Sequence, residues 1–210
     1  VTDVIVDTPR RCLWVSTYTD GLDRFDPTTG VFEHFNSRTL PDWPDNQLWC
    51  VALGNNGNVL TGHVGAGFTV LDPERRRVRN FRHIPADPQS LPGNQVRSVL
   101  VDSYRNIWVG TDEGLALFDE PSGTFTCFEP DDNATLGTGA PHNIMHLAET
   151  KDGRLWISTE NGGVRILDIR NSLGKRSRDV HFKHIGVQPE GFDGTGVSNK
   201  TIHSVFEDSF

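Results

Sequence analysis

The sequence predicts an all-β fold made of a four-stranded unit that recurs along the chain. Its 210 residues include 21 glycines and 12 prolines, a composition that suits many short strands joined by tight turns better than long helices. The apolar runs between these turn residues have the length of strands, and they recur in the same order. Such units are expected to stack side by side, because one unit cannot bury both of its faces alone.

The repeat is anchored on a large apolar residue in the second strand of each unit. The anchors are Trp14, Leu60, Trp108 and Trp156, which lie 46, 48 and 48 residues apart. A glycine follows each anchor after six or seven residues and an aspartate after eleven or twelve: Gly21, Gly67, Gly114 and Gly163, then Asp26, Asp72, Asp119 and Asp168. A period of 40 to 50 residues is typical of the four-stranded blades of a β-propeller.

Each unit contains four strands, which are clearest in unit three: VRSVLVD, NIWVGT, GLALFD and TFTCF. Turn residues separate them, as tight hairpins require. We therefore expect a single partial β-propeller at 1–210, a fragment of a larger one, with four complete blades of antiparallel strands plus the first strand of a fifth. The expected boundaries are 3–36, 46–84, 94–130 and 142–186, with the next blade starting at 200–210.

The tryptophan anchors are expected to pack between neighbouring blades. An aromatic side chain removes roughly 150 to 250 Å² from water when it is buried, and the same residue type in several copies indicates a structural role. We therefore assign Trp14, Trp108 and Trp156 to inter-blade packing and not to ligand binding.

Composition excludes several classes of function. The net charge of −8 and the isoelectric point near 5.4 argue against a nucleic-acid partner, which would require a basic face. The sequence contains no run of 18 apolar residues, the minimum that would indicate a membrane-spanning helix. The three cysteines, Cys12, Cys50 and Cys127, are odd in number and lack CxxC spacing, so neither a disulfide framework nor a cysteine zinc site is expected, and their redox state stays open.

No catalytic or cofactor motif is present. His142 and His146 have HxxxH spacing, but four residues along a strand span roughly 13 Å, too far for one zinc ion. Phosphate-binding, nucleophile-elbow and calcium-loop patterns are missing from the sequence. We therefore expect a non-enzymatic chain with no catalytic residue, no metal and no cofactor.

The candidate ligand-binding residues lie on one predicted face. In a propeller, the turns between the second and third strands share a face with the loops between blades, and first strands line the axis. Carboxylates, amides and an exposed aromatic on that face suit sugar hydroxyls. The candidates are Tyr18, Asp20, His63, Asp112, Glu113, Glu160 and Asn161 from the turns, Trp43 from an inter-blade loop, and Arg97 and His146 from first strands.

Unit three resembles a known repeat. Its NIWVGT, acidic turn, GLALFD and following phenylalanine are similar to the two component regulator propeller repeat, and so are the connectors at 87–99 and 194–205. Unit two departs from that pattern, with Leu60 in place of tryptophan and GHVGAGF in place of the acidic turn. These repeats form the extracytoplasmic sensor region of bacterial hybrid two-component histidine kinases, especially carbohydrate-responsive ones of gut bacteria.

The resemblance implies a periplasmic, ligand-sensing propeller that recognises an oligosaccharide or another small extracytoplasmic ligand. It would signal to a kinase outside these 210 residues. The other blades of the parent propeller and a possible homodimer are the implied partners. Two alternatives stay open at this point: a propeller polysaccharide lyase or glycosidase, which requires a pair of essential carboxylates, and a scaffold that docks proteins through an exposed apolar patch.

Overall fold

The computed structural model describes residues 1–128, 143–160, 162–174, 180, 182–185 and 201–208. Within them, four antiparallel sheets each contain four strands that are consecutive in sequence. Blade one contains β1 (Asp3–Asp7), β2 (Cys12–Ser16), β3 (Leu22–Asp26) and β4 (Val31–Phe35). Blade two contains β5 (Leu48–Leu53), β6 (Val59–His63), β7 (Phe68–Asp72) and β8 (Arg77–Phe81), with a short 3-10 turn at Asn55–Gly57.

The other two sheets follow the same plan. Blade three contains β9 (Val96–Val101), β10 (Ile107–Thr111), β11 (Gly114–Asp119) and β12 (Thr124–Phe128). Blade four contains β13 (Ile144–Glu149), β14 (Arg154–Thr159), β15 (Val164–Asp168), the helix α1 (Ile169–Ser172) and β16 (Lys183–Ile185). The helix lies in the stretch that lengthens unit four. All-β architecture and four-stranded antiparallel blades are thus confirmed.

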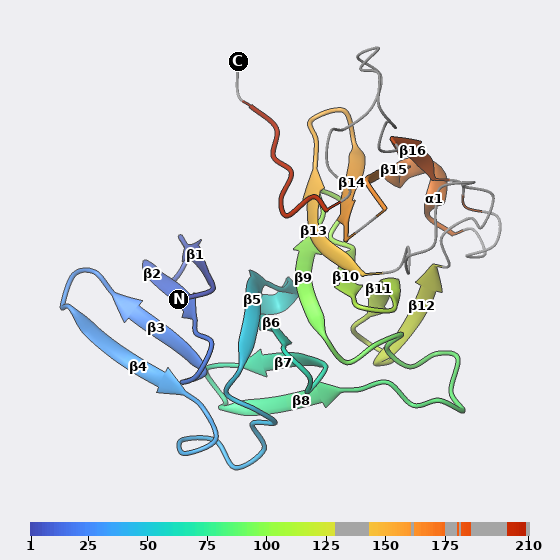
Figure 1. Ribbon diagram of the computed structural model, residues 1–210. Coiled ribbons are helices and arrows are strands. Elements are labelled where there is room, and N and C mark those ends of the chain that lie inside the picture. The colour runs from blue at the N-terminus through green and yellow to red at the C-terminus, as the bar shows by residue number, and fades with distance from the viewer. Residues whose placement is uncertain (129–142, 161, 175–179, 181, 186–200, 209–210) are drawn as a thin grey trace.

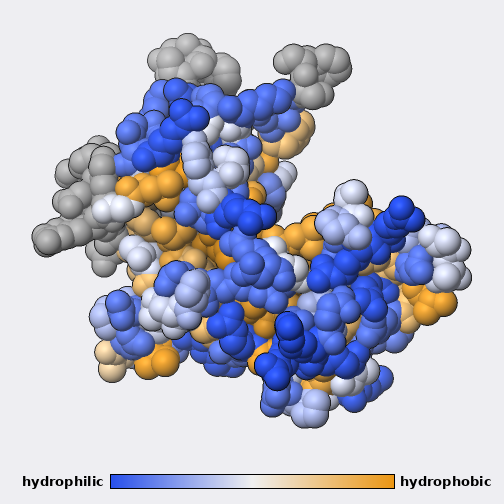
Figure 2. Space-filling model, turned by 180° about the vertical axis from the view of Figure 1, so that it is seen from behind, coloured by the Kyte–Doolittle hydropathy of each residue, from blue (hydrophilic) through white to orange (hydrophobic). Residues whose placement is uncertain are grey.

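The blades follow one another as an arc whose inner edge is formed by their first strands (Figure 1). β5 contacts both β1 and β9, and β9 in turn contacts β13. Seen from behind, the molecule is hollowed between blade one and blade four, and hydrophobic residues border the hollow (Figure 2). Val4 and Val6 of β1 are among the exposed apolar side chains.

The repeated aspartate shapes the turn between the third and fourth strands. Its carboxylate accepts a backbone N–H two or three residues later, from Thr28 to Asp26 at 2.8 Å and from Arg75 to Asp72 at 3.0 Å. Aspartate is favoured in tight turns for this bond. In unit four the same contact, from Asn171 N to Asp168, caps α1 at 3.1 Å.

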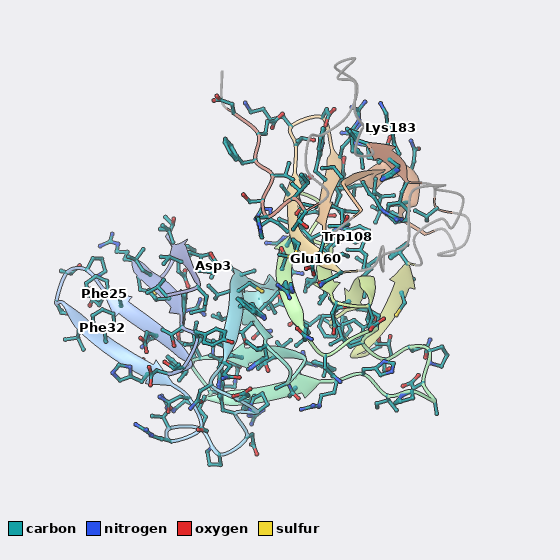
Figure 3. All side chains as sticks on the ribbon, in the orientation of Figure 1. Asp3, Phe25, Phe32, Trp108, Glu160 and Lys183 are labelled. Atoms are coloured by element: carbon teal, nitrogen blue, oxygen red, sulfur yellow. The ribbon has the colours of Figure 1, made fainter. Side chains whose placement is uncertain are left out.

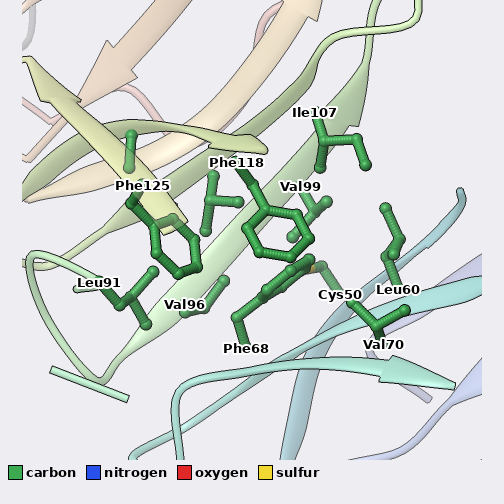
Figure 4. Close-up of a cluster of buried hydrophobic side chains, with 12 residues drawn as sticks. Cys50, Leu60, Phe68, Val70, Leu91, Val96, Val99, Ile107, Phe118 and Phe125 are labelled. Carbon is green, nitrogen blue, oxygen red and sulfur yellow. The ribbon is translucent and has the colours of Figure 1, made fainter. Parts of the chain in front are cut away.

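In the described part of the chain, three hydrophobic clusters form the core, and each lies between two consecutive blades. Trp14 belongs to the cluster between blades one and two, Leu60 to the next and Trp108 to the cluster between blades three and four. All three side chains are 0% exposed. Figure 4 shows the middle cluster, where Phe68 meets Phe118 edge-on with ring centroids 5.0 Å apart. The inter-blade role predicted for Trp14 and Trp108 is confirmed, whereas Trp156 is only half-buried.

Trp14 and Trp108 each donate a hydrogen bond from the indole N–H to a buried aspartate of the same blade. Trp14 Nε1 donates to Asp7 at 3.0 Å, and Trp108 Nε1 donates to Asp102 at 2.8 Å. Burial alone would raise the pKa of Asp7, but hydrogen bonds from Trp14 and Arg10 outweigh burial and hold that pKa below its usual value. In unit two the aspartate is replaced by Gly54 where the tryptophan is replaced by leucine, so donor and acceptor are absent together.

The first strands of successive blades are joined by side-chain acceptors at one repeated position. Asp3 accepts from Val51 N at 3.1 Å, and Ser98 accepts from Leu147 N at 3.1 Å. His146 Nδ1 accepts from Val205 N at 3.4 Å.

The segment 201–208 was expected to form the first strand of a fifth blade, but it is not a strand in the structure. It nevertheless follows the path of one, because Ile202 N donates to Thr159 O as Leu48 N donates to Thr17 O. Such single bonds to blade four do not amount to a strand ladder.

Candidate functional site

The turns after β2, β6, β10 and β14 lie beside the loops that lead into the first strands, and together they form what we call the loop face. Backbone bonds tie the two sets together: Val64 N donates to Gln47 O at 3.0 Å, Asp112 N to Gln95 O at 3.1 Å and Glu160 N to Asn143 O at 2.9 Å. The expected grouping of these turns and loops on one face is therefore present. Because backbone atoms hold each turn, its side chains are available for other contacts.

A polar cavity of about 540 Å³ opens on the loop face between blades two and three. Asp112 accepts from Gln95 N at 3.2 Å, and Asn94 Oδ1 accepts from His83 N at 2.9 Å. His83 Nδ1 lies 2.8 Å from Leu91 O. The cavity is lined by Val64, Gly65, His83, Pro92, Gly93, Asn94, Gln95, Asp112 and Glu113.

Two of the predicted ligand residues, Asp112 and Glu113, thus line this cavity. Neither carboxylate forms an ion pair with any residue that the structure describes. Glu113 N donates to Thr111 Oγ1 at 3.1 Å, which fixes the turn. A positioned carboxylate can accept hydrogen bonds from hydroxyl groups at several lone pairs.

Three side chains from successive blades meet at the inner end of the loop face. The ring of Tyr18, 45% exposed, meets the ring of Trp49 edge-on with centroids 5.5 Å apart. The guanidinium of Arg97 lies over the Trp49 ring at 5.3 Å from its centroid. Tyr18 and Arg97 were predicted to be ligand residues and Trp49 was not, so the structure adds Trp49 to the candidate site.

Register explains why Trp49 and Arg97 meet. In β5, Leu48 pairs with His63 and Cys50 with Gly62, which leaves Trp49 unpaired in a β-bulge. β9 skips Arg97 between its paired residues in the same way, and β13 skips Met145. A bulge turns the extra side chain away from the regular alternation of the strand. The repeated position on the inner strands is therefore 49, 97 and 145.

His146 was predicted to line the axis with Arg97, but it lies one residue further along the repeat. It occupies the position of Asp3 and Ser98, where its Nδ1 accepts from Val205 N. Burial lowers its pKa. His146 therefore contacts the segment that follows blade four and does not lie at the position equivalent to Arg97.

Trp43 and His63 were predicted to bind ligand on the loop face, but both side chains are buried. Trp43 is 3% exposed and packs in the cluster between blades one and two. His63, at the end of β6, is 0% exposed and its Nε2 lies 2.9 Å from the Thr69 hydroxyl. The two rings meet with centroids 5.8 Å apart, because the loop 36–47 folds back over the core.

His63 is expected to make stability depend on pH. Burial lowers its pKa to about 4, against roughly 6.5 in an unfolded chain. The unfolded state therefore binds the proton more tightly, so the contribution of neutral His63 is complete above pH 6.5 and is lost as the pH falls towards 4. The loss reaches about 3 kcal/mol. Urea unfolding at pH 7 and pH 4.5 should show a smaller drop in His63→Gln than in the wild type.

The exposed His34 provides the control for this measurement. It lies on the surface of blade one, so His34→Gln removes a histidine but leaves buried His63 in place, and the loss of stability that His63 causes is expected to persist in this variant. An identical drop in stability for wild type and His63→Gln would contradict a buried neutral imidazole.

Two further candidates, Asp20 and Glu160, lie outside the cavity. Asp20, in the turn of blade one, accepts from the Thr19 hydroxyl at 2.7 Å and is exposed. Glu160, in the equivalent turn of blade four, accepts a hydrogen bond from the Asn143 side chain, and Figure 3 labels it together with Trp108. Asn161 lies outside the described residues.

The opposite face carries a cavity of about 720 Å³ between the outer parts of blades one and two. Its two glutamates are paired with arginines: Glu74 with Arg10 at 3.1 Å, and Glu33 with Arg24 at 2.5 Å and Arg76 at 2.7 Å. Its third carboxylate, Asp26, accepts the backbone N–H of Thr28. The glutamates and arginines thus form a charge network that joins blades one and two.

Potential metal ligands and membrane spans were sought in the same described segments. No three histidine, cysteine or carboxylate side chains among them are placed to share a metal ion. None of the helices in those segments is long and apolar enough to cross a bilayer.

Consecutive four-stranded sheets, joined along their first strands with the core between them, define the blades of a β-propeller. The two component regulator propeller family model matches residues 90–113 and 138–161. The chain therefore contains two component regulator propeller repeats, as the resemblance in its sequence predicted.

Solved structures agree with this. The extracellular domain of the hybrid two component system BT3049 from B. thetaiotaomicron is 33% identical over 100% of the chain, with a TM-score of 0.79. The chain spans 24% of that structure. Virginiamycin B lyase from Staphylococcus aureus shares the fold, with 11% identity, a TM-score of 0.63 and coverage of 89% of this chain and 55% of the lyase. No curated protein sequence matches the chain.

Proposed function

We propose that the chain is part of the extracytoplasmic sensor of a hybrid two-component system and that its loop face binds a carbohydrate. The observation that carries the proposal is the cavity between blades two and three, where Asp112 and Glu113 stand without an ion-pair partner among the described residues. The relative at 33% identity is itself an extracellular domain of a hybrid two component system. In this role the chain binds its ligand without turnover and acts in the periplasm.

The chemistry of the cavity favours a polyhydroxylated ligand. Two carboxylates supply acceptors, and Asn94 and Gln95 supply amide groups from the adjoining loop. Planar groups of this kind form paired hydrogen bonds with neighbouring hydroxyls. The lining is largely polar, which suits a sugar better than an apolar molecule.

The position of the cavity suits a sensor. Val64 and His83 belong to the strand connections of blade two, whereas Asp112 and Glu113 belong to blade three. A ligand that touches both sides favours one relative arrangement of the two blades, and such a bias is what transmits binding to a distant kinase. The other blades of the parent propeller and a second copy in a homodimer are the elements to which the change would pass.

The test is a thermal-shift screen of the protein against neutral and acidic oligosaccharides, followed by calorimetry. A ligand at a hundred times its dissociation constant stabilises the folded state by about 2.7 kcal/mol. Glu113→Gln is expected to raise the dissociation constant of a hit at least tenfold, roughly the effect of losing a hydrogen bond to a charged group.

Asp20→Asn is the matched control, because Asp20 occupies a turn of blade one outside the cavity. It is expected to bind like the wild type. Two results would contradict the proposal: a screen without a hit, or equal affinity in the wild type and Glu113→Gln. Release of shortened saccharides from a hit would instead indicate the lyase or glycosidase alternative.

A further inference from the structure

The guanidinium of Arg97 has no counter-ion among the described residues. It lies over the Trp49 ring, and among the described residues its Nε is buried without an acceptor. Arg10, Arg24 and Arg76, by contrast, each pair with a carboxylate. A buried donor without an acceptor is costly, and none of the described residues supplies an acceptor for Arg97 Nε.

A second donor without a partner lies beside it. The indole Nε1 of Trp49 is also buried without an acceptor among the described residues. Trp49 and Arg97 both offer only donors, so the partner that suits them is an acceptor, and the positive charge favours an anionic one. Buried unsatisfied polar groups are few in native proteins, and two on adjacent side chains indicate one shared ligand group.

The fold places these donors next to the carbohydrate cavity. Val96, which precedes Arg97, pairs with Thr111, and Thr111 is followed by Asp112 of the cavity. Tyr18 adds an exposed aromatic ring against Trp49. The carboxylates of Asp112 and Glu113 repel an anionic group from the cavity, whereas Arg97 attracts it, so an acidic sugar has one favoured orientation.

We propose that Arg97, Trp49 and Tyr18 form a subsite for the anionic group of an acidic saccharide, a carboxylate or a sulfate ester. The inference rests on the proposed function and deepens it. The sugar hydroxyls bind in the cavity, and the anionic group accepts hydrogen bonds from the Arg97 guanidinium and the Trp49 indole Nε1. Bulged positions on the inner strands bring the two donors together from different blades.

The test compares saccharides that differ only in charge. Oligomers of galacturonate and of glucuronate, their methyl esters, and a sulfated neutral oligosaccharide beside its unsulfated form are titrated into the protein by calorimetry. At least one charged form is expected to bind ten times more tightly than its uncharged counterpart, and added salt is expected to reduce that difference. The uronate and sulfate arms identify which anionic group is bound.

The Arg97→Met variant tests the assignment to this residue. Methionine is compatible with the position because Met145 occupies it in β13. The variant is expected to bind charged and uncharged forms equally, while Arg38→Met, which changes an exposed arginine on the loop before β5, keeps the preference. Trp49→Phe retains the ring and removes the indole donor, so it should weaken the charged form alone. Thermal unfolding of each variant reports whether it is folded.

The outcomes separate the two proposals. Equal binding of charged and uncharged forms to the wild type, or a preference that survives in Arg97→Met, overturns the anionic subsite. If Glu113→Gln still weakens binding in either case, the carbohydrate site itself stands. Failure of every saccharide to bind overturns both.

Discussion

Replacement of Trp108 by alanine is expected to lower the free energy of unfolding by about 3 to 5 kcal/mol. The side chain is 0% exposed and fills the cluster between blades three and four, so truncation leaves a cavity that two sheets must close. Asp102 would stay satisfied, because it also accepts from Tyr104 N at 2.9 Å and Asn106 N at 2.8 Å. Urea unfolding followed by circular dichroism measures the loss.

Trp156→Ala is the matched control for Trp108→Ala. It removes the same side chain at the same position of the next repeat, where the tryptophan is half-buried. The expected cost is less than half as large, since it scales with buried apolar area. Equal losses for the two variants would contradict the packing of the anchor between blades.

Replacement of Gly67 by alanine is expected to cost at least about 2 kcal/mol. Gly67 has a φ of +85°, and an added Cβ would lie 2.1 Å from the carbonyl oxygen of Phe81. The backbone of β8 leaves no room for this Cβ, so the turn between β6 and β7 would have to move. The midpoint of thermal unfolding is expected to fall by several degrees.

Gly65→Ala controls for the loss of glycine in the same turn. A Cβ at Gly65 meets no atom within 4 Å, so its effect is expected to stay within about 0.5 kcal/mol. Comparable destabilisation by the two substitutions would show that chain flexibility, and not the close approach to Phe81, sets the cost.

The fold could be predicted because each landmark of the repeat has a local physical role. The tryptophans bury large surfaces between blades, Gly67 allows a close backbone approach, and aspartates such as Asp72 hold the turn after the third strand. Roles of this kind require one residue type at one position, so they leave a period in the sequence. The fifth-blade segment was predicted from the likeness of IHSVFEDSF to VRSVLVDSY, but strand pairing depends on neighbours as well as on sequence.

The inner end of the site could be predicted only in part. A bulge changes which side chain leaves the inner strand, so Arg97 was paired with His146 although its counterpart is Met145. The signal was present, because Trp49, Arg97 and Met145 are spaced 48 residues apart. An assumption of strict alternation along each strand conceals this repeat, because it does not allow for the bulges.

Burial was the other obstacle. Trp43 lies in a loop between prolines, which favours an exposed position, yet it packs in the core. His63 follows three apolar or small residues at the end of a strand and is fully enclosed. Whether a loop folds over the core depends on long-range contacts that a short stretch of sequence does not encode.

Hydrogen–deuterium exchange with and without the oligosaccharide that gives the largest thermal shift tests ligand binding on the loop face most directly. Protection is predicted for amides around the cavity, in particular Gln95, Asp112 and Glu113, while amides of the opposite cavity, such as Arg11 and Thr28, stay unchanged. Protection confined to the opposite cavity, or no local protection despite saturating ligand, would contradict a carbohydrate site on the loop face.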